Sequence, residues 1–142
     1  MDSVCLGLDV GGRRVGVALS DPDGLVAVPL TTVVRRDTES AVEQVATLAR
    51  EHNAGCIVVG LPALLSGEVG AEAERVQEFA KALERRTGRP VEWWDERLSS
   101  VAAEKLMRDM GARREKRDAN RDALAAALIL QAYLDHKRIS SS

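Results

Sequence analysis

Three extended segments in a row, followed by an alternation of helices and strands, constrain the fold of this chain more than any other feature. Apolar segments predict strands at residues 4–10, 14–20, 25–34, 56–61 and 91–94. Only Gly11-Gly12-Arg13 separates the first two, which predicts a tight hairpin. Pro29 cannot donate a ladder hydrogen bond, so it indicates that the third segment lies at a sheet edge or an irregularity.

Helical periodicity and capping residues predict four helices. They cover residues 38–52, 71–86, about 100–111 and 120–136. Asp37 or Thr38 can cap the first helix, and Gly55 is expected to end it. Ser99 or Ser100 can cap the third helix.

The order β-β-β-α-β-α-β-α-α predicts an α/β fold with a mixed five-stranded sheet flanked by helices. The first three strands should form an antiparallel meander, and the later strands should run parallel because each follows a helical crossover. A chain of 142 residues has the size of one domain, so we expect residues 1–142 to form one unit. Ligands of such sheets bind beyond the C-terminal ends of the parallel strands.

The composition is that of an ordinary globular protein, with 45% hydrophobic and 30% charged residues. We find neither a signal peptide nor an apolar run of the roughly 18–20 residues needed to cross a bilayer. Cys5 and Cys56 lie in apolar strand segments without metal-ligand spacing, and we interpret them as buried free thiols. These features predict a soluble cytoplasmic protein with no membrane partner.

The net charge of −2 gives no overall sign of nucleic-acid binding, but the positive charges are unevenly distributed. One stretch contains Lys105, Arg108, Arg113, Arg114, Lys116, Arg117 and Arg121. Such a stretch forms either a solvated loop or a phosphate-binding surface. Beside a phosphodiester site, we expect its central residues to bind nucleic acid, namely Arg113, Arg114, Lys116 and Arg117.

Carboxylates follow two of the predicted strands. Asp9 lies between Leu8 and Val10 near the end of the first strand, where an anion is costly to bury unless a cation or hydrogen-bond donors compensate it. It can also be a turn residue that accepts amide hydrogens from the following glycines. Asp95 and Glu96 end the fifth strand, either as site residues or as part of a surface ion-pair cluster.

A further carboxylate, Asp122, opens the last predicted helix. It can stabilise the helix dipole, or it can face the sheet together with Ala125 and Ala126, which lie on the same helical face. These alanines would let the helix pack closely and bring Asp122 towards the strand ends. Asp118 lies one turn earlier and is the alternative for this position.

Taken together, Asp9, Glu96 and Asp122 form the kind of set that phosphodiester hydrolysis uses. Oxygen ligands from separate elements bind Mg²⁺ or Mn²⁺. Two such ions about 3.5–4 Å apart activate a water and stabilise the leaving oxygen. The pattern therefore predicts a hydrolase, a metal-dependent nuclease that uses two ions, with Asp95 and Asp118 as second-choice ligands.

Four segments also resemble a known family. LGLDVGGRRVGVALSD, IVVGLP, DERLSS and RDALAAALILQAYL resemble, in this order, the conserved blocks of the YqgF family, also called RuvX. The resemblance implies a ribonuclease-H-like fold and a nuclease of ribosome biogenesis that matures the 5′ end of pre-16S rRNA. The family is also described as Holliday-junction-resolvase-like.

By position, the resemblance implies that Asp9, Glu96 and Asp122 are the catalytic and metal-binding residues and that Arg97 contacts phosphate. Asp95 remains an alternative to Glu96, since neighbouring strand residues point to opposite faces. Two departures from the family pattern are Arg121, where an apolar residue is usual, and Gly12, where Thr or Ala is commoner.

Several functions are compatible with these features. The leading one is hydrolysis of RNA in a ribosomal precursor, by a monomer or a homodimer. A resolvase that cuts branched DNA in recombination or repair is the first alternative and favours a dimer, because paired cuts need two symmetric sites. The others are a non-catalytic RNA-binding protein of ribosome assembly and a phosphotransferase, since Asp-x-Gly after a first strand also resembles the phosphate-binding start of sugar kinases.

Overall fold

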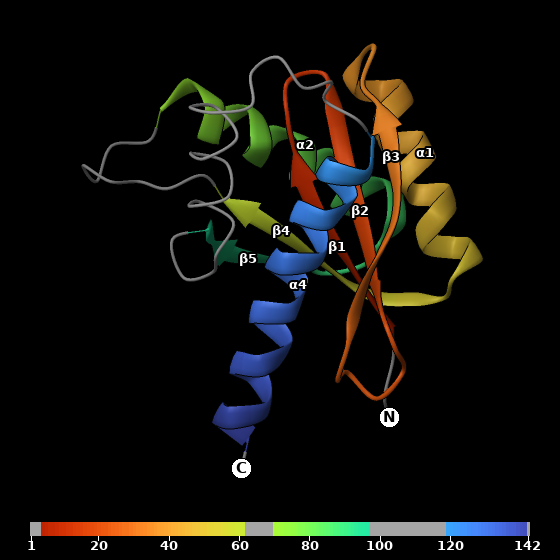
Figure 1. The fold of residues 1–142 in the computed structure, drawn as a ribbon. Helices are drawn as coiled ribbons and strands as arrows, with labels where there is room; N and C mark the ends of the chain where they lie inside the picture. Colours follow the sequence, from red (N-terminus) through yellow and green to blue (C-terminus); the bar gives the residue numbers. More distant parts are fainter. Residues whose placement is uncertain (1–3, 62–69, 97–118, 142) are drawn as a thin grey trace.

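The computed structural model describes residues 4–61, 70–96 and 119–141 of the chain (Figure 1). Its strands are β1 Val4–Val10, β2 Arg14–Ser20, β3 Ala27–Val34, β4 Ala54–Leu61 and β5 Val91–Asp95. Its helices are α1 Thr38–Glu51, α2 Ala71–Thr87 and α4 Ala119–Ser141. The helix predicted near residues 100–111 lies outside the described residues.

The five strands form one mixed sheet in the order β3-β2-β1-β4-β5. β1, β2 and β3 pair antiparallel, whereas β4 pairs parallel with both β1 and β5. A hydrogen bond from the Gly11 amide to the Arg14 carbonyl (2.8 Å) closes the first hairpin. The predicted meander and the predicted parallel strands are both confirmed.

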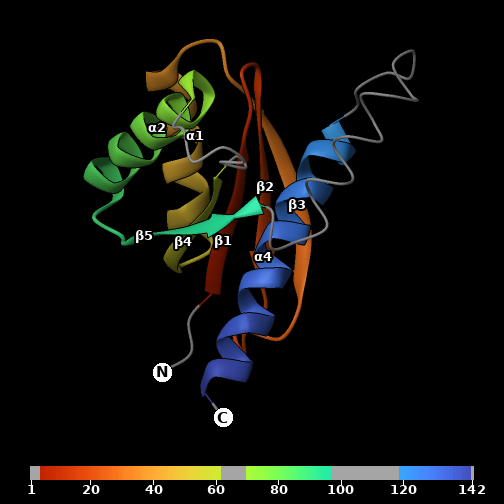
Figure 2. The ribbon, with the colours of Figure 1, turned by 90° about the vertical axis from the view of Figure 1, so that its left-hand side faces the viewer.

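Helices cover the two faces of the sheet differently (Figures 1 and 2). α1 and α2 pack on one face, and α4 crosses the other. Strand alternation sends Leu6, Leu8 and Val10 into the core under α1 and α2. The core on the α4 face instead contains many alanines, with Ile129, Leu130 and Leu134 as its largest aliphatic side chains. We use "α4 face" below for that side of the sheet.

Two element boundaries differ from the prediction. Asn53, with φ 55°, makes the left-handed turn after α1, whereas Gly55 lies inside β4, so the prediction that Gly55 ends the helix was wrong. Asn adopts this conformation more readily than most residues because its short polar side chain can bond locally. α4 extends to Ser141 rather than ending near residue 136.

Other local predictions are confirmed. Asp37 caps α1 by accepting a hydrogen bond from the Ser40 amide at 2.7 Å. Pro29 lies on the edge strand β3, next to a register shift in its pairing with β2. Cys5 and Cys56 are free thiols and neighbours in the β1–β4 ladder, although they are half-buried rather than buried. No helix in the described ranges has both the length and the apolarity needed to cross a membrane.

Candidate active site

Asp9 is the last residue but one of β1 and has only 7% of its surface exposed. Its neighbours Leu8 and Val10 point into the core under α1 and α2. Because successive strand residues point to opposite sides, Asp9 points to the α4 face. The strand therefore holds one nearly buried carboxylate near its C-terminal end.

Asp122, in the first turn of α4, lies over the strand next to Asp9. Gly16 of β2 is the register partner of Asp9. A Cβ atom at Gly16 would overlap the Asp122 carbonyl oxygen, so the helix backbone rests directly on this glycine. Only a residue without a side chain permits this approach. It brings the first turn of α4 beside the end of β1.

Glu96 immediately follows β5 and is only 4% exposed. A Cβ atom at Gly60 would lie 3.2 Å from Glu96 Oε2 and 2.5 Å from Ile129 Cδ1 of α4. The Glu96 carboxylate therefore lies on the α4 face, over Gly60. Since Leu8 pairs with Val59, Gly60 stands one residue further along, beside Asp9. Glycines on two strands thus make room for parts of the same site.

The same geometry distinguishes Glu96 from Asp95. Trp94 packs in the α4-face core, so alternation along β5 directs Asp95 to the opposite side of the sheet. Asp95 is half-buried there and pairs with Leu61 in the ladder. The geometry therefore favours Glu96 as the companion of Asp9.

The site also contains a basic residue that was not predicted from the sequence. Arg14 Nε lies 2.7 Å from Asp122 Oδ2, and the two side chains are 29% and 20% exposed. Both residues line an open groove that also includes the exposed Arg13, Gly11, Gly12 and Val34. The signal was present in the hairpin turn, where two arginines follow Asp9 by four and five residues.

The donors suit a divalent cation in their chemistry, since all are hard carboxylate oxygens and two belong to nearly buried residues. Within the described ranges, however, no three such side chains are close enough together to hold an ion. Asp122 is instead ion-paired with Arg14. In this conformation, the Asp122 carboxylate therefore faces the Arg14 guanidinium.

Several predicted site residues lie outside the described residues. They are Arg97, Arg113, Arg114, Lys116, Arg117 and the alternative ligand Asp118. Their roles remain predictions. Asp9, Glu96 and the start of α4 are the predicted residues that the structure brings to one end of the α4 face.

A mixed sheet of this order, with one helix laid across the face that carries the acids, defines a ribonuclease-H-like α/β protein. Known structures agree with this class. RuvC of Thermus thermophilus in complex with a Holliday junction substrate superposes with a TM-score of 0.58 at 17% identity, covering 96% of each chain. The fowlpox virus Holliday junction resolvase gives 0.55 at 12% identity, covering 94% of this chain and 99% of that one.

Sequence comparison identifies the family. The family model described as "RuvX: Holliday junction resolvase" matches residues 3–136, so the chain belongs to the RuvX family. A relative from Chloroflexus aurantiacus, named "Putative pre-16S rRNA nuclease", is 47% identical over 96% of this chain and 90% of its own length. One of the same name from Lachnospira eligens is 44% identical over 94% of this chain and 97% of its own.

Proposed function

We propose that this protein is a divalent-metal-dependent nuclease that processes the 5′ end of the 16S rRNA precursor in the bacterial cytoplasm. Family membership supports hydrolysis of a phosphodiester bond, and the names of the relatives support the ribosomal precursor as substrate. The observation that carries the proposal is that Asp9 and Glu96, both nearly buried, share one end of the α4 face with Asp122.

The burial of Asp9 and Glu96 is compatible with a bound cation. A carboxylate removed from water loses hydration free energy, and it regains it only through a cation or strong donors. Asp9, Glu96 and Asp122 would hold Mg²⁺ or Mn²⁺. The chemistry that a pair of such ions supplies is activation of water and stabilisation of the leaving oxygen. The backbone positions of the three carboxylates come from the end of β1, the residue after β5 and the first turn of α4.

The arginines of the hairpin turn complete this proposal. Arg13 and Arg14 line the groove that begins at Asp122. A phosphodiester backbone entering this groove would meet two guanidinium groups, whose planar donors match phosphate oxygens. Arg14 would then exchange its Asp122 partner for substrate phosphate, which releases Asp122 towards the cation.

The test is cleavage of labelled pre-16S-like RNA and of a four-way DNA junction, each with Mn²⁺, with Mg²⁺ or with EDTA. We expect metal-dependent cutting of the RNA and little cutting of the junction. Asp9→Asn and Glu96→Gln should each lower the rate at least about 100-fold, the equivalent of roughly 3 kcal/mol of transition-state stabilisation. Asp95→Asn is the matched control, and it should retain the rate within about threefold because Asp95 points to the other face.

The outcomes separate the alternatives. Preference for the junction would replace the proposed substrate with branched DNA. RNA binding without metal-dependent cutting, unchanged in Asp9→Asn, would indicate a non-catalytic RNA-binding protein. Cutting that survives both Asp9→Asn and Glu96→Gln would contradict the assignment of the site.

A further inference from the structure

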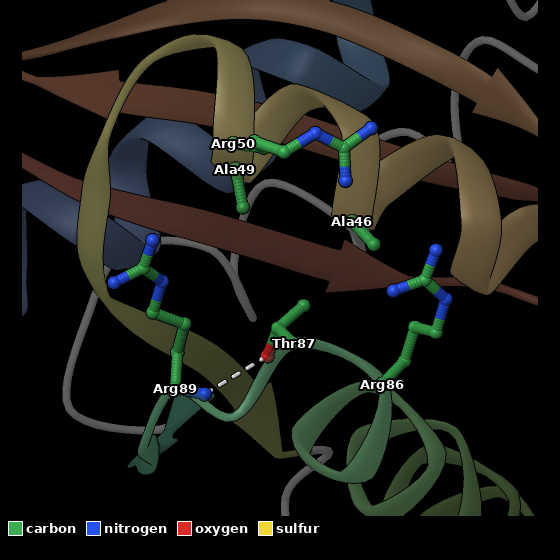
Figure 3. Close-up of a pocket in the computed structure, with 6 residues that line it drawn as sticks. All are labelled: Ala46, Ala49, Arg50, Arg86, Thr87 and Arg89. Carbon is green, nitrogen blue, oxygen red and sulfur yellow. Dashed lines mark hydrogen bonds between the residues drawn. The ribbon is translucent and has the colours of Figure 1, made fainter.

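Three arginines surround a second, smaller hollow between α1 and α2. Arg50 comes from the last turn of α1, Arg86 from the last turn of α2, and Arg89 from the loop before β5 (Figure 3). Ala46, Ala49 and Thr87 complete the lining. The hollow has a volume of about 90 Å³. One water needs roughly 10–15 Å³, so a tetrahedral oxyanion can enter.

Local structure holds Arg89 in place at this hollow. Gly88, with φ 71°, ends α2 in the left-handed conformation and turns the chain back towards α1. The Thr87 hydroxyl donates to the Leu83 carbonyl (2.9 Å) and accepts from the Arg89 amide (3.1 Å, dashed in Figure 3). On the other side, the small side chains of Ala46 and Ala49 leave the space unfilled. The backbone that carries Arg89 is therefore fixed.

Among the described residues that line the hollow, none carries a carboxylate. Arg86 pairs with Glu43 of α1, through Nε to Oε2 (2.5 Å) and Nη2 to Oε1 (3.1 Å). This pairing raises the pKa of Arg86 and lowers that of Glu43. It uses two of the roughly five N–H donors of a guanidinium and leaves the others for a ligand. In the part of the chain that the structure describes, neither Arg50 nor Arg89 makes an ion pair.

We propose that this hollow, defined by Arg50, Arg86 and Arg89, binds a phosphate group. Guanidinium groups match phosphate oxygens two at a time. Glu43 balances the charge of Arg86, so Arg50 and Arg89 are the two cations at the hollow without an ion-pair partner among the described residues. The phosphate can come from a polynucleotide backbone or from a free phosphate ion. The backbone source rests on the proposed nuclease function, whereas the free-ion source does not.

Position indicates which part of a polynucleotide would be bound. Arg89 precedes β5 and Glu96 follows it, so the hollow lies towards the opposite end of this strand from the candidate active site. Seven residues at about 3.3 Å each separate them by roughly 23 Å. The hollow lies on the α1 and α2 side of the sheet and the acids lie on the α4 face, so a polynucleotide bound at both must also pass around the sheet. At about 3.4 Å per nucleotide along a duplex, it would therefore extend at least roughly seven nucleotides from the cleaved bond. Short RNAs held at the acids would not reach the hollow.

The experiment compares Arg50→Ala/Arg89→Ala with Arg75→Ala/Lys81→Ala. The control removes the same charge from exposed positions of α2 that do not line the hollow. Inorganic phosphate is titrated into each protein at constant ionic strength, with thermal unfolding and amide NMR shifts of residues 87–89 as readouts. Fluorescence anisotropy then measures binding of 4- and 20-nucleotide RNAs in EDTA, where metal-dependent cleavage does not occur.

We expect phosphate to stabilise wild type and control and to shift their amide signals, and to do neither in Arg50→Ala/Arg89→Ala. If the backbone is the source, that variant also binds the 20-nucleotide RNA at least about fivefold more weakly, with a salt slope reduced by about 0.7 per lost contact, and binds the 4-nucleotide RNA normally. If free phosphate is the source, RNA binding equals that of the control. Equal phosphate responses in all three proteins would overturn the proposal, whatever the cleavage assays show.

If the alanine variant does not fold, Arg50→Gln/Arg89→Gln replaces it, since Gln keeps part of the aliphatic side chain but has no charge and fewer N–H donors. It should lose the phosphate response to the same extent. A phosphate response that persists in a folded Gln variant would also overturn the proposal.

Discussion

The two faces of the sheet differ in how closely their helices pack on the strands. Under α1 and α2, large side chains fill the space between helices and strands, among them Leu6, Leu8, Phe79 and Leu83, all fully buried. On the α4 face, glycines replace them. A Cβ at Gly7 would lie 2.7 Å from Leu130 Cβ, and one at Gly60 would lie 2.5 Å from Ile129 Cδ1. Large side chains therefore separate the sheet from α1 and α2, whereas the strand backbone lies close to α4 on the other face.

This difference explains where the candidate active site lies. Close packing of α4 leaves little room for large apolar side chains near Asp9, and it brings the α4 backbone at Asp122 onto Gly16. The face under α1 and α2 contains the larger of the two hydrophobic cores and so contributes more of the burial that stabilises the fold. The α4 face can then hold nearly buried acids at some cost in stability. Substitutions on the two faces should therefore have different consequences.

Phe79→Ala should have the largest effect on stability. The ring is fully buried, and the Arg35 guanidinium lies 5.3 Å from its centre. Its removal should lower the free energy of unfolding by about 3–5 kcal/mol, and Phe79→Leu should cost less than roughly 1.5 kcal/mol. Urea unfolding measures both. If packing under α1 and α2 does not influence the site on the α4 face, the folded variant binds Mn²⁺ with the wild-type affinity. A large loss of affinity would show that the two faces are coupled.

Gly16→Ala should affect both stability and the site. The new methyl group overlaps the backbone of Asp122, so α4 must shift, at a cost of about 3 kcal/mol. Gly12→Ala is the control, since no atom of the described residues lies within 4 Å of its Cβ position, and it should change stability by less than about 0.5 kcal/mol. Unfolding and Mn²⁺ titrations should show a joint loss only for Gly16→Ala. Normal metal binding in that variant would mean that close helix packing does not build the site.

Arg14→Ala should change metal binding more than stability. The ion pair with Asp122 is partly exposed, so its loss should lower stability by about 1 kcal/mol or less. Because Arg14 and a cation compete for the same carboxylate, Mn²⁺ affinity should rise by roughly fivefold, the equivalent of about 1 kcal/mol. Calorimetric titration of Mn²⁺ measures the change. Weaker metal binding in Arg14→Ala would show that the pair positions Asp122 rather than competes for it.

The smallest effect should come from Asp21→Asn, in the exposed turn before β3. Hydrogen bonds from the Val26 and Leu25 amides to the Asp21 carboxylate lower its pKa below the ordinary 3.8. A lowered folded-state pKa stabilises the protein above the unfolded value, and this stabilisation is lost as pH falls through the folded value. Wild type should exceed the variant in stability at pH 7 and approach it near pH 3. A pH-independent difference in urea midpoints would contradict this.

Much of the fold could be predicted because its signals are local. Strand periodicity and the short Gly11-Gly12-Arg13 turn specify the hairpin, and helical crossovers make β4 and β5 parallel. The end of α1 was harder to predict. Gly55 carried the usual stop signal, yet Asn53 makes the turn, because β4 already pairs from Ala54.

The candidate site required the tertiary structure. Sequence left Asp95 and Glu96 as alternatives, and the choice depends on which side of β5 faces α4. The ion pair between Arg14 and Asp122 joins residues 108 positions apart in the chain, so no local pattern indicates it. Likewise, the sequence does not distinguish Gly16 from other strand residues, and its role follows only from the contact of the α4 backbone with it.

The most direct test of the account is Mn²⁺ binding, measured by calorimetry on wild type, Asp9→Asn, Glu96→Gln, Asp122→Asn and the control Asp95→Asn. We expect each of the first three substitutions to weaken Mn²⁺ binding by at least about tenfold, while Asp95→Asn binds as wild type does. Equal affinities in all five proteins, or a loss confined to Asp95→Asn, would contradict the claim that Asp9, Glu96 and Asp122 form one metal site on the α4 face.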